Sequence, residues 1–249
     1  MPDPAQRRRA GGRAVRKALR HSLRRRRLWP EAFRIAFDAP VLSDIAFAPF
    51  YRQAKRTYAL ADAIVGTSDE YAARGFRDRA EDIPKVVAYV GNDLAAFDAG
   101  ALANAGQVDK PAGEFWVAYA GAMSDCYDLR TLVRAMAKLQ KSRPCAKLKL
   151  MGDGMIREEL EILVAETGCD ADFMGYMPYP VMAAHLVASD VLVNSLVENA
   201  PQSVPTKIGD YLAAGKPMLS TSMSPEFWAK VEADGFGVNV RPGDVDGLV

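Results

Sequence analysis

The stretch from Asn194 to Tyr211 carries the clearest candidate chemistry in the sequence. It leaves a predicted strand, crosses a polar loop and enters a predicted helix that begins at Pro205 and ends at Gly215. Free N–H groups and the helix dipole favour a phosphate at such a helix start. Lys207 and Asp210 lie three positions apart, on one face of this helix. We therefore expect Lys207 to meet a diphosphate and Asp210 to accept hydrogen bonds from a ribose diol. The alternative is an ordinary helix start with a surface ion pair.

A parallel sheet is needed to position these residues, and the sequence from residue 115 onward predicts one. Short apolar runs alternate with amphipathic helical stretches. Repeated β-α units of this length predict an α/β fold with a Rossmann-like parallel sheet, covered by helices on both faces. Ligands of such sheets bind at the carboxyl ends of the strands. The predicted strands are 115–120, 147–151, 171–174, 191–194, 218–220 and 238–240.

Residues 51–93 show a smaller amount of the same pattern. A helix over 51–60 and strands over 63–66 and 86–90 are expected, with Ser68 as a helix N-cap. Two strands cannot form an independent sheet with a sufficient core, so we expect an incomplete Rossmann-like domain here. The predicted domains are a basic, disordered arm (1–27), this partial N-terminal domain with its linker (28–110), and a C-terminal Rossmann-like domain (111–249).

The first 27 residues form a basic arm. They hold eleven of the 32 Lys and Arg residues and one of the 31 acids, so the rest of the chain is acidic. Val15, Leu19 and Leu23 recur at helical spacing, which fits a helix on an anionic membrane surface. The other interpretations are a disordered, solvated arm and an out-of-frame reading of a GC-rich gene.

Metal sites and membrane spans are not predicted. Cys126, Cys145, Cys169, His21 and His185 are too widely spaced to form a zinc site. The odd cysteine count fits a reducing compartment. The sequence has neither a run of 18 apolar residues nor the apolar core of a signal peptide. We expect a cytoplasmic protein without a metal or cofactor, with peripheral contact at the inner membrane face as a further option.

Five short motifs follow one another in a recognisable order. They are Trp29-Pro30-Glu31-Ala32-Phe33, Gly121 through Tyr127-Asp128-Leu129, Gly152-Asp153-Gly154, Phe173-Met174-Gly175, and Val204-Pro205-Thr206-Lys207-Ile208-Gly209-Asp210 continuing to Pro217. This order resembles that of the GT-B fold glycosyltransferases of family 4, most closely the branch that builds bacterial surface polysaccharides. The resemblance covers residues 28–249, and residues 204–217 are its most specific part.

The resemblance implies a retaining, metal-independent glycosyltransferase without a cofactor. Its donor would be a nucleotide-diphospho-sugar, a UDP- or GDP-sugar, held mainly by residues 111–249. Its acceptor would be lipid-linked or a polysaccharide, and nucleic acid is not an expected partner. Because charge develops on the departing diphosphate, its electrostatic stabilisation would be the main catalytic task.

The resemblance implies that two loops contact the donor, since they occupy the positions of the family's donor-binding loops. Gly121 and the loop as far as Asp125 would face the donor phosphates. Gly175, Tyr176 and Met177 would offer backbone groups to the base.

The segment around Lys207 would bind the diphosphate and the ribose. Gln202, Ser203 and Val204 would present N–H groups to the diphosphate. Lys207 would neutralise the charge of the leaving group, and Asp210 would hold the ribose.

The sequence departs from the family pattern at two places in this site. The family's pair of glutamates, eight residues apart, falls on Gln202 and Asp210. Asp210 can still bind ribose, but Gln202 is no carboxylate, so an acidic role there is lost or passes to Glu198. The loop 122–128 lacks the basic residue that the family commonly has, which leaves Lys207 with less help.

The resemblance also predicts an N-terminally truncated chain. In the family, a run of strands and helices that receives the acceptor precedes the Trp29-Pro30-Glu31 motif, and further helices follow the position of Val249. We therefore expect a fragment or a frameshifted reading frame. An inactive remnant that only binds nucleotide is an alternative that fits the same departures. A non-hydrolysing nucleotide-sugar epimerase and a binding module that docks through its basic arm are the remaining alternatives.

Overall fold

The computed structural model describes residues 40–76, 83–200 and 204–249. The chain divides into two compact units, one ending at Tyr89 and the other beginning at Val90. The basic arm, the Trp29-Pro30-Glu31 motif, Gln202 and Ser203 lie outside the described residues. The domain boundaries expected from the sequence stay predictions.

The smaller unit contains two parallel strands, and the chain passes from one to the other through a short helix. Its elements are α3 (Pro40–Ala59), β1 (Ile64–Gly66), α4 (Asp69–Arg74) and β2 (Lys85–Val87), with β1 paired to β2. Ser68 caps α4, because its side chain accepts a hydrogen bond of 3.1 Å from the backbone N–H of Tyr71. The N-cap expected at this position is thereby confirmed.

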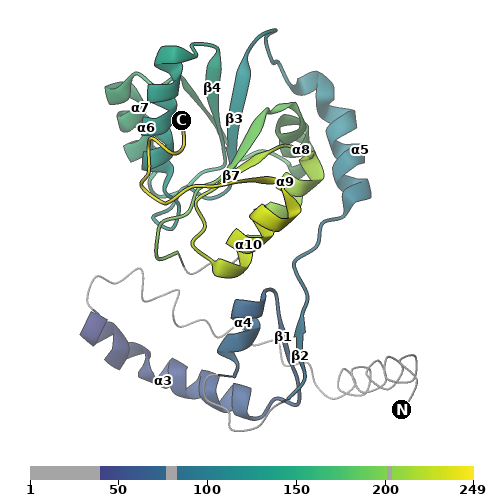
Figure 1. Cartoon of the computed structure of the whole chain (residues 1–249), viewed down its shortest axis with the longest axis vertical. Coiled ribbons are helices and arrows are strands. Elements are labelled where there is room, and N and C mark those ends of the chain that lie inside the picture. The colour runs from purple at the N-terminus through teal and green to yellow at the C-terminus, as the bar shows by residue number, and fades with distance from the viewer. Residues whose placement is uncertain (1–39, 77–82, 201–203) are drawn as a thin grey trace. The chain divides into compact units, whose positions relative to one another are not determined.

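The larger unit is built on a six-stranded, fully parallel sheet in the order β5-β4-β3-β6-β7-β8 (Figure 1). The predicted α/β fold with a Rossmann-like sheet is confirmed. The strands are β3 (Phe115–Ala120), β4 (Ala146–Met151), β5 (Ala171–Gly175), β6 (Val191–Asn194), β7 (Met218–Ser220) and β8 (Gly237–Asn239). The helices are α5 (Leu94–Asn104), α6 (Leu129–Ser142), α7 (Arg157–Thr167), α8 (Tyr179–Ala188), α9 (Lys207–Ala214) and α10 (Pro225–Asp234).

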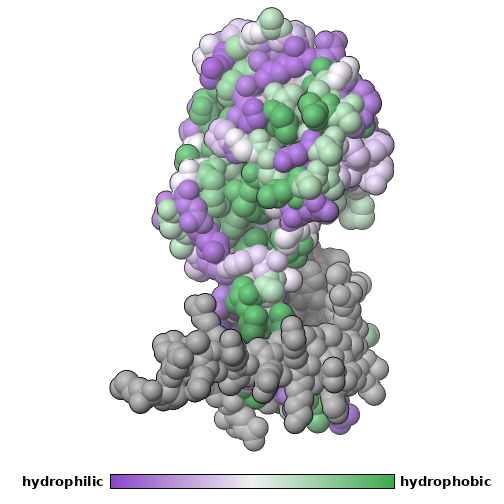
Figure 2. Space-filling model, turned by 90° about the vertical axis from the view of Figure 1, so that its right-hand side faces the viewer, coloured by the Kyte–Doolittle hydropathy of each residue, from purple (hydrophilic) through white to green (hydrophobic). Residues whose placement is uncertain are grey.

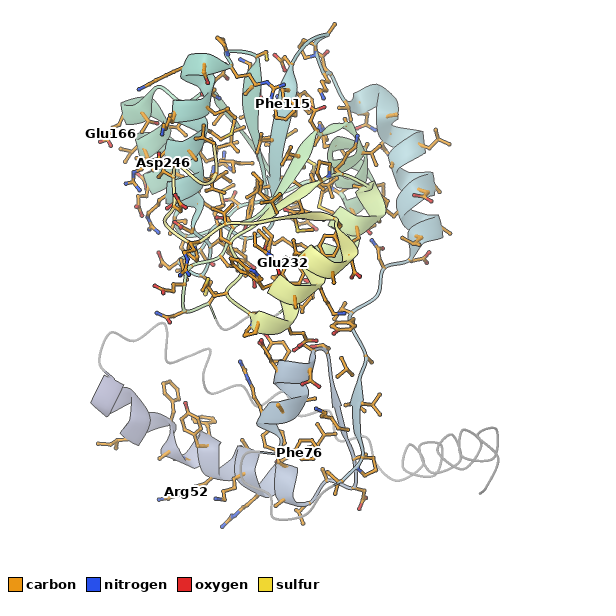
Figure 3. All side chains as sticks on the ribbon, in the orientation of Figure 1. Arg52, Phe76, Phe115, Glu166, Glu232 and Asp246 are labelled. Atoms are coloured by element: carbon orange, nitrogen blue, oxygen red, sulfur yellow. The ribbon has the colours of Figure 1, made fainter. Side chains whose placement is uncertain are left out.

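Helices cover both faces of this sheet, because alternate strand residues point to opposite sides. Val117 and Tyr119 of β3 pack in a core with α6 and α7, whereas Ala118 and Ala120 pack in a second core with α5, α8, α9 and α10. Side chains fill both layers in Figure 3, where Phe115 marks the amino end of β3. The functional loops belong to the opposite, carboxyl edge.

Helix α5 lies in a stretch that the sequence analysis expected to be a linker. Asp93 caps it by accepting a hydrogen bond of 3.0 Å from the N–H of Ala96, and Phe97 is fully buried. The helix packs against α8, where a Cβ on Gly100 would lie 3.0 Å from Pro180. The α5 side of the larger unit mixes hydrophilic and hydrophobic residues (Figure 2). Its sequence, rich in Ala and Gly, lacks a clear apolar stripe, which explains why periodicity did not reveal the helix.

The strand order reverses between β3 and β6, and helix α9 follows β6 at that point. Helix α9 begins at Lys207 rather than at Pro205, so the predicted start was two residues too early. The turn before it closes with a tighter hydrogen bond of 3.2 Å from the N–H of Ile208 to the carbonyl of Pro205. Gly215, in the left-handed conformation, ends the helix as expected.

Tyr211 fixes α9 to both strands at the reversal point. Its buried hydroxyl accepts a hydrogen bond of 2.9 Å from the N–H of Ala120 in β3 and donates one of 3.2 Å to the carbonyl of Val193 in β6. Burial also raises the pKa of this hydroxyl, which keeps it neutral. Tyr211 therefore links α9, and Lys207 with it, to both strands.

We predict that Tyr211→Phe lowers the free energy of unfolding by about 2 kcal/mol, because the buried N–H of Ala120 loses its acceptor. Urea denaturation followed by far-UV circular dichroism measures the change. Tyr176→Phe serves as the control, since the Tyr176 side chain is 89% exposed. Equal stability of the two variants would show that the Tyr211 hydroxyl does not hold α9.

Candidate functional site

Three glycines bring the loops after β3, β4 and β5 into contact at the carboxyl edge of the sheet. The N–H of Gly152 donates a hydrogen bond of 2.8 Å to the carbonyl of Gly175, and the N–H of Gly121 donates one of 2.9 Å to Met151. A Cβ on Gly152, whose φ is +124°, would lie 2.0 Å from the carbonyl oxygen of Gly121. Only glycine fits at Gly152, so the loops at this edge are held close together.

The ammonium group of Lys207 lies at the centre of this edge, between two aromatic rings. Its Nζ is 3.8 Å from the ring centroid of Tyr119 and 4.1 Å from that of Tyr127. A Cβ on Gly121 would lie 2.9 Å from Nζ, so glycine at this position leaves room for the side chain. Among the described residues, Nζ has no hydrogen-bond partner although Lys207 is buried.

The environment of Lys207 disfavours the charged form of its side chain as long as no anion is bound. Its pKa lies well below the usual range because burial removes the water that would solvate the charge. The two rings stabilise an ammonium by about 2 kcal/mol, which is less than the several kcal/mol that desolvating an unpaired cation costs. A buried cation site without an anion is therefore suited to a ligand that brings negative charge.

Asp210 lies in a hydrogen-bonded triad that we call the Asp210 triad, formed with Asn92 and Tyr179. Its Oδ1 accepts hydrogen bonds of 2.9 Å from Nδ2 of Asn92 and 2.8 Å from the hydroxyl of Tyr179. Burial raises the pKa of Asp210, while these two hydrogen bonds lower it. Asp210 makes no ion pair with Lys207, so the alternative of a surface ion pair on this helix is wrong.

The remaining predicted donor residues are spread over the same edge. Tyr176 is exposed, and Met177 is partly buried against the core under α8. Val204 also packs against that core. Glu198 is exposed, and no hydrogen bond or ion pair of its side chain occurs within the part of the chain that the structure describes. Asp125 is exposed and forms an ion pair of 3.1 Å with Arg130. Their roles toward a donor stay predictions.

Two arginines approach the edge from helices, which the sequence analysis did not foresee. Arg130 of α6 binds Asp125 and Glu159, and these carboxylates raise its pKa. Arg157 of α7 bonds to Asp153 and Glu161. The loop 122–128 has no basic residue of its own, but Arg130 reaches back to it. Both guanidinium groups are already paired with carboxylates, so Lys207 remains the unpaired cation of this edge among the described residues.

Asn92 and Tyr179 were also missed, because nothing in the sequence connects them with Asp210. They lie 118 and 31 positions away from it, and only the packing of α5, α8 and α9 brings the three together. His185 is buried and stacked on Trp116, with the ring centroids 6.2 Å apart.

Metal ligands and membrane-crossing helices are absent from the described ranges. In residues 40–76, 83–200 and 204–249 there is no group of three His, Cys, Asp or Glu residues placed to hold a metal ion. Nor is any helix of these ranges both long enough and apolar enough to cross a bilayer.

Known proteins resemble this chain in sequence profile and in fold. The profile of the family described as glycosyl transferases group 1 matches residues 114–249. HepE from Anabaena, solved in complex with UDP-glucose, has 18% identity and a TM-score of 0.65 over 89% of this chain and 58% of that chain. Sucrose-phosphate synthase from Thermosynechococcus elongatus has 25% identity and a TM-score of 0.63 over 81% of this chain and 50% of its own.

WaaG, a glycosyltransferase involved in lipopolysaccharide biosynthesis, is a third similar structure. It has 15% identity and a TM-score of 0.60, covering 74% of this chain and 50% of that chain. No curated protein sequence matches this chain. The chain spans between half and three fifths of the length of these structural neighbours.

We predict that Lys207→Met raises the free energy of unfolding at pH 7 by about 2 kcal/mol, because an unpaired buried amine is replaced by an apolar group of similar length. The unfolded chain holds the lysine proton up to a pKa of about 10.4, whereas the folded chain releases it at lower pH. Between these two pKa values the unfolded state binds more protons, so the stability of the wild type rises with pH. The advantage of the variant should therefore shrink toward pH 10.

Denaturation curves at pH 7 and pH 10 measure this difference. Lys141→Met is the matched control, since Lys141 is exposed on α6 and should respond little at either pH. A Lys207→Met variant that is less stable than the wild type at pH 7 would contradict the prediction.

Proposed function

Since the chain belongs to the glycosyl transferases group 1 family, we propose that its larger unit binds a nucleotide-diphospho-sugar and takes part in transfer of the sugar to an acceptor. The observation that carries this proposal is the buried ammonium of Lys207, which lacks an anionic partner within the described part of the chain. It lies where the strand order reverses, and ligands of open α/β sheets bind at such points.

A diphosphate fits the surroundings of Lys207. Lys207 is the first residue of α9, so it lies at the positive end of the helix dipole, which also favours an anion. The cation would gain an anionic partner, and the low-dielectric surroundings would strengthen their attraction. Since negative charge grows on the leaving diphosphate during sugar transfer, the same contact would stabilise the transition state.

The neighbouring groups suit the other parts of a nucleotide donor. Asp210 lies one helical turn beyond Lys207, where a carboxylate can accept hydrogen bonds from a ribose diol. The backbone at Gly121 would contact the phosphates, and the backbone from Gly175 to Met177 would contact the base. Glu198, an exposed carboxylate after β6, is the candidate acid near the sugar, and the polar residues Gln202 and Ser203 stay candidates for contacting the diphosphate.

We infer the finer properties from the resemblance to family 4 and from the structural neighbours. The solved complex of HepE with UDP-glucose supports a UDP-sugar as the donor. Lys207 would provide the positive charge that a metal ion supplies in other transferases, which supports metal-independent transfer. Retention of anomeric configuration and a lipid-linked or polysaccharide acceptor rest on the family 4 resemblance, and WaaG supports the latter.

We predict that UDP and UDP-glucose bind the purified chain and raise its thermal unfolding midpoint. A ligand at 100 times its Kd stabilises the folded state by about 2.7 kcal/mol. Lys207→Met should abolish this shift while keeping or raising the stability of the free protein. Lys141→Met should keep the shift, and added EDTA should leave it unchanged. GDP and GDP-mannose, tested in parallel, identify the base.

A folded wild-type protein that no nucleotide stabilises would refute the proposed donor site. A shift that persists in Lys207→Met would place the nucleotide elsewhere. Proton NMR of UDP-glucose incubated with the chain separates two reactions. Release of UDP together with an α-linked product supports retaining transfer, whereas formation of a sugar epimer on UDP would indicate an epimerase.

A further inference from the structure

The Asp210 triad joins three segments of the larger unit through one carboxylate oxygen. Asn92 precedes α5, Tyr179 begins α8, and Asp210 lies in the first turn of α9. Both donors meet Asp210 at Oδ1, and the hydroxyl of Tyr179 also lies 3.0 Å from Oδ1 of Asn92. The other oxygen, Oδ2, has no hydrogen bond within the described residues.

The number of hydrogens in the triad determines which acceptors remain free. The hydroxyl of Tyr179 carries a single hydrogen, but two acceptors lie within its reach. An ionised carboxylate is the stronger acceptor, so this hydrogen goes to Asp210. Oδ1 of Asn92 is then left without a donor. The triad thus offers two unsatisfied acceptors, Oδ2 of Asp210 and Oδ1 of Asn92, from adjoining side chains.

Packing holds these groups in place before any ligand binds. The ring of Tyr179 meets the ring of buried Phe97 edge to face, with centroids 6.2 Å apart. A Cβ on Gly209 would lie 3.5 Å from the Cβ of Asn92, so α9 approaches this residue closely. A site with two fixed acceptors binds a ligand that donates a hydrogen bond to each of them more tightly than a ligand that lacks one of the two donors.

Resting on the proposed function, we propose that Tyr179 and Asn92 position the Asp210 carboxylate, and that Asp210 and Asn92 together accept the two hydroxyl groups of the donor's ribose. The vicinal diol supplies two O–H donors, and the triad supplies two free acceptors. Tyr179 acts through Asp210 and is a positioning residue, whereas Asn92 also contacts the ligand. The site therefore selects ribonucleotides over 2′-deoxyribonucleotides.

Isothermal titration of the full chain with UDP, 2′-deoxy-UDP, GDP and 2′-deoxy-GDP tests this selection. The wild type should bind the ribonucleotide about tenfold more tightly than its deoxy counterpart, which corresponds to one hydrogen bond. We assign the 2′-hydroxyl to Asp210, so Tyr179→Phe should weaken ribonucleotide binding by about tenfold, change deoxynucleotide binding little and bring the ribo-to-deoxy ratio close to one. Asn92→Ala removes the acceptor of the 3′-hydroxyl, which deoxynucleotides keep, so it should weaken the binding of all four ligands.

The pH dependence of binding separates positioning from a purely structural role. Burial raises the pKa of Asp210, and the hydrogen bond from Tyr179 opposes that rise. Removing the hydroxyl in Tyr179→Phe should raise this pKa further, so ribonucleotide affinity should be lost at a higher pH as the solution is acidified. A variant that only loosened the fold would weaken all four ligands at every pH.

Tyr58→Phe and Asn104→Ala are the matched controls, because Tyr58 lies in α3 and Asn104 at the far end of α5. Tyr179→Phe keeps the ring packed on Phe97, so it decides the outcome even if Asn92→Ala unfolds. Nucleotide binding with an unchanged ribo-to-deoxy ratio in Tyr179→Phe would overturn this inference and leave the proposed function standing. Absence of nucleotide binding by the folded wild type would overturn both.

Discussion

The hydroxyl group of Tyr211 joins the two strands between which the sheet reverses its order. It accepts from β3 and donates to β6, so α9 is fixed to both strands by one side chain. The groups that α9 contributes to the carboxyl edge depend on that attachment. Lys207 lies one turn before Tyr211 on the same helix and Asp210 lies next to it, so the position of the cation and of the carboxylate follows from the position of the tyrosine.

In the free protein, the buried side chain of Lys207 lowers the free energy of unfolding. Its burial becomes favourable only when an anionic ligand pairs with it. Its amine contacts two rings and no acceptor among the described residues, an arrangement that burial opposes and that a diphosphate would correct. Arg130 and Arg157 lie near the same edge but satisfy nearby carboxylates. An apolar residue at position 207 would therefore favour stability, whereas a lysine favours binding of an anion. Such a trade-off between stability and function is common in binding sites.

Local sequence patterns predicted the sheet well and the site only in part. The apolar run 115–120 and the Gly215 helix end were predicted at the residues where they occur, because burial and left-handed backbone geometry leave strong local marks. Lys207 and Asp210 were recognised through their spacing after a strand. Asn92 and Tyr179 could not be, since their contact with Asp210 exists only after α5, α8 and α9 have packed. Likewise, Tyr127 became a neighbour of Lys207 through the fold and not through the sequence.

The division of the chain between Tyr89 and Val90 leaves Asn92 and the whole of α5 with the larger unit. Phe97 fills that unit's core, and Asn92 completes the Asp210 triad. In evolutionary terms, a recombination event that exchanged the sheet at a point after α5 would separate the carboxylate from one of its two donors. Inheritance of this unit as an intact module requires that the crossover fall before Asn92.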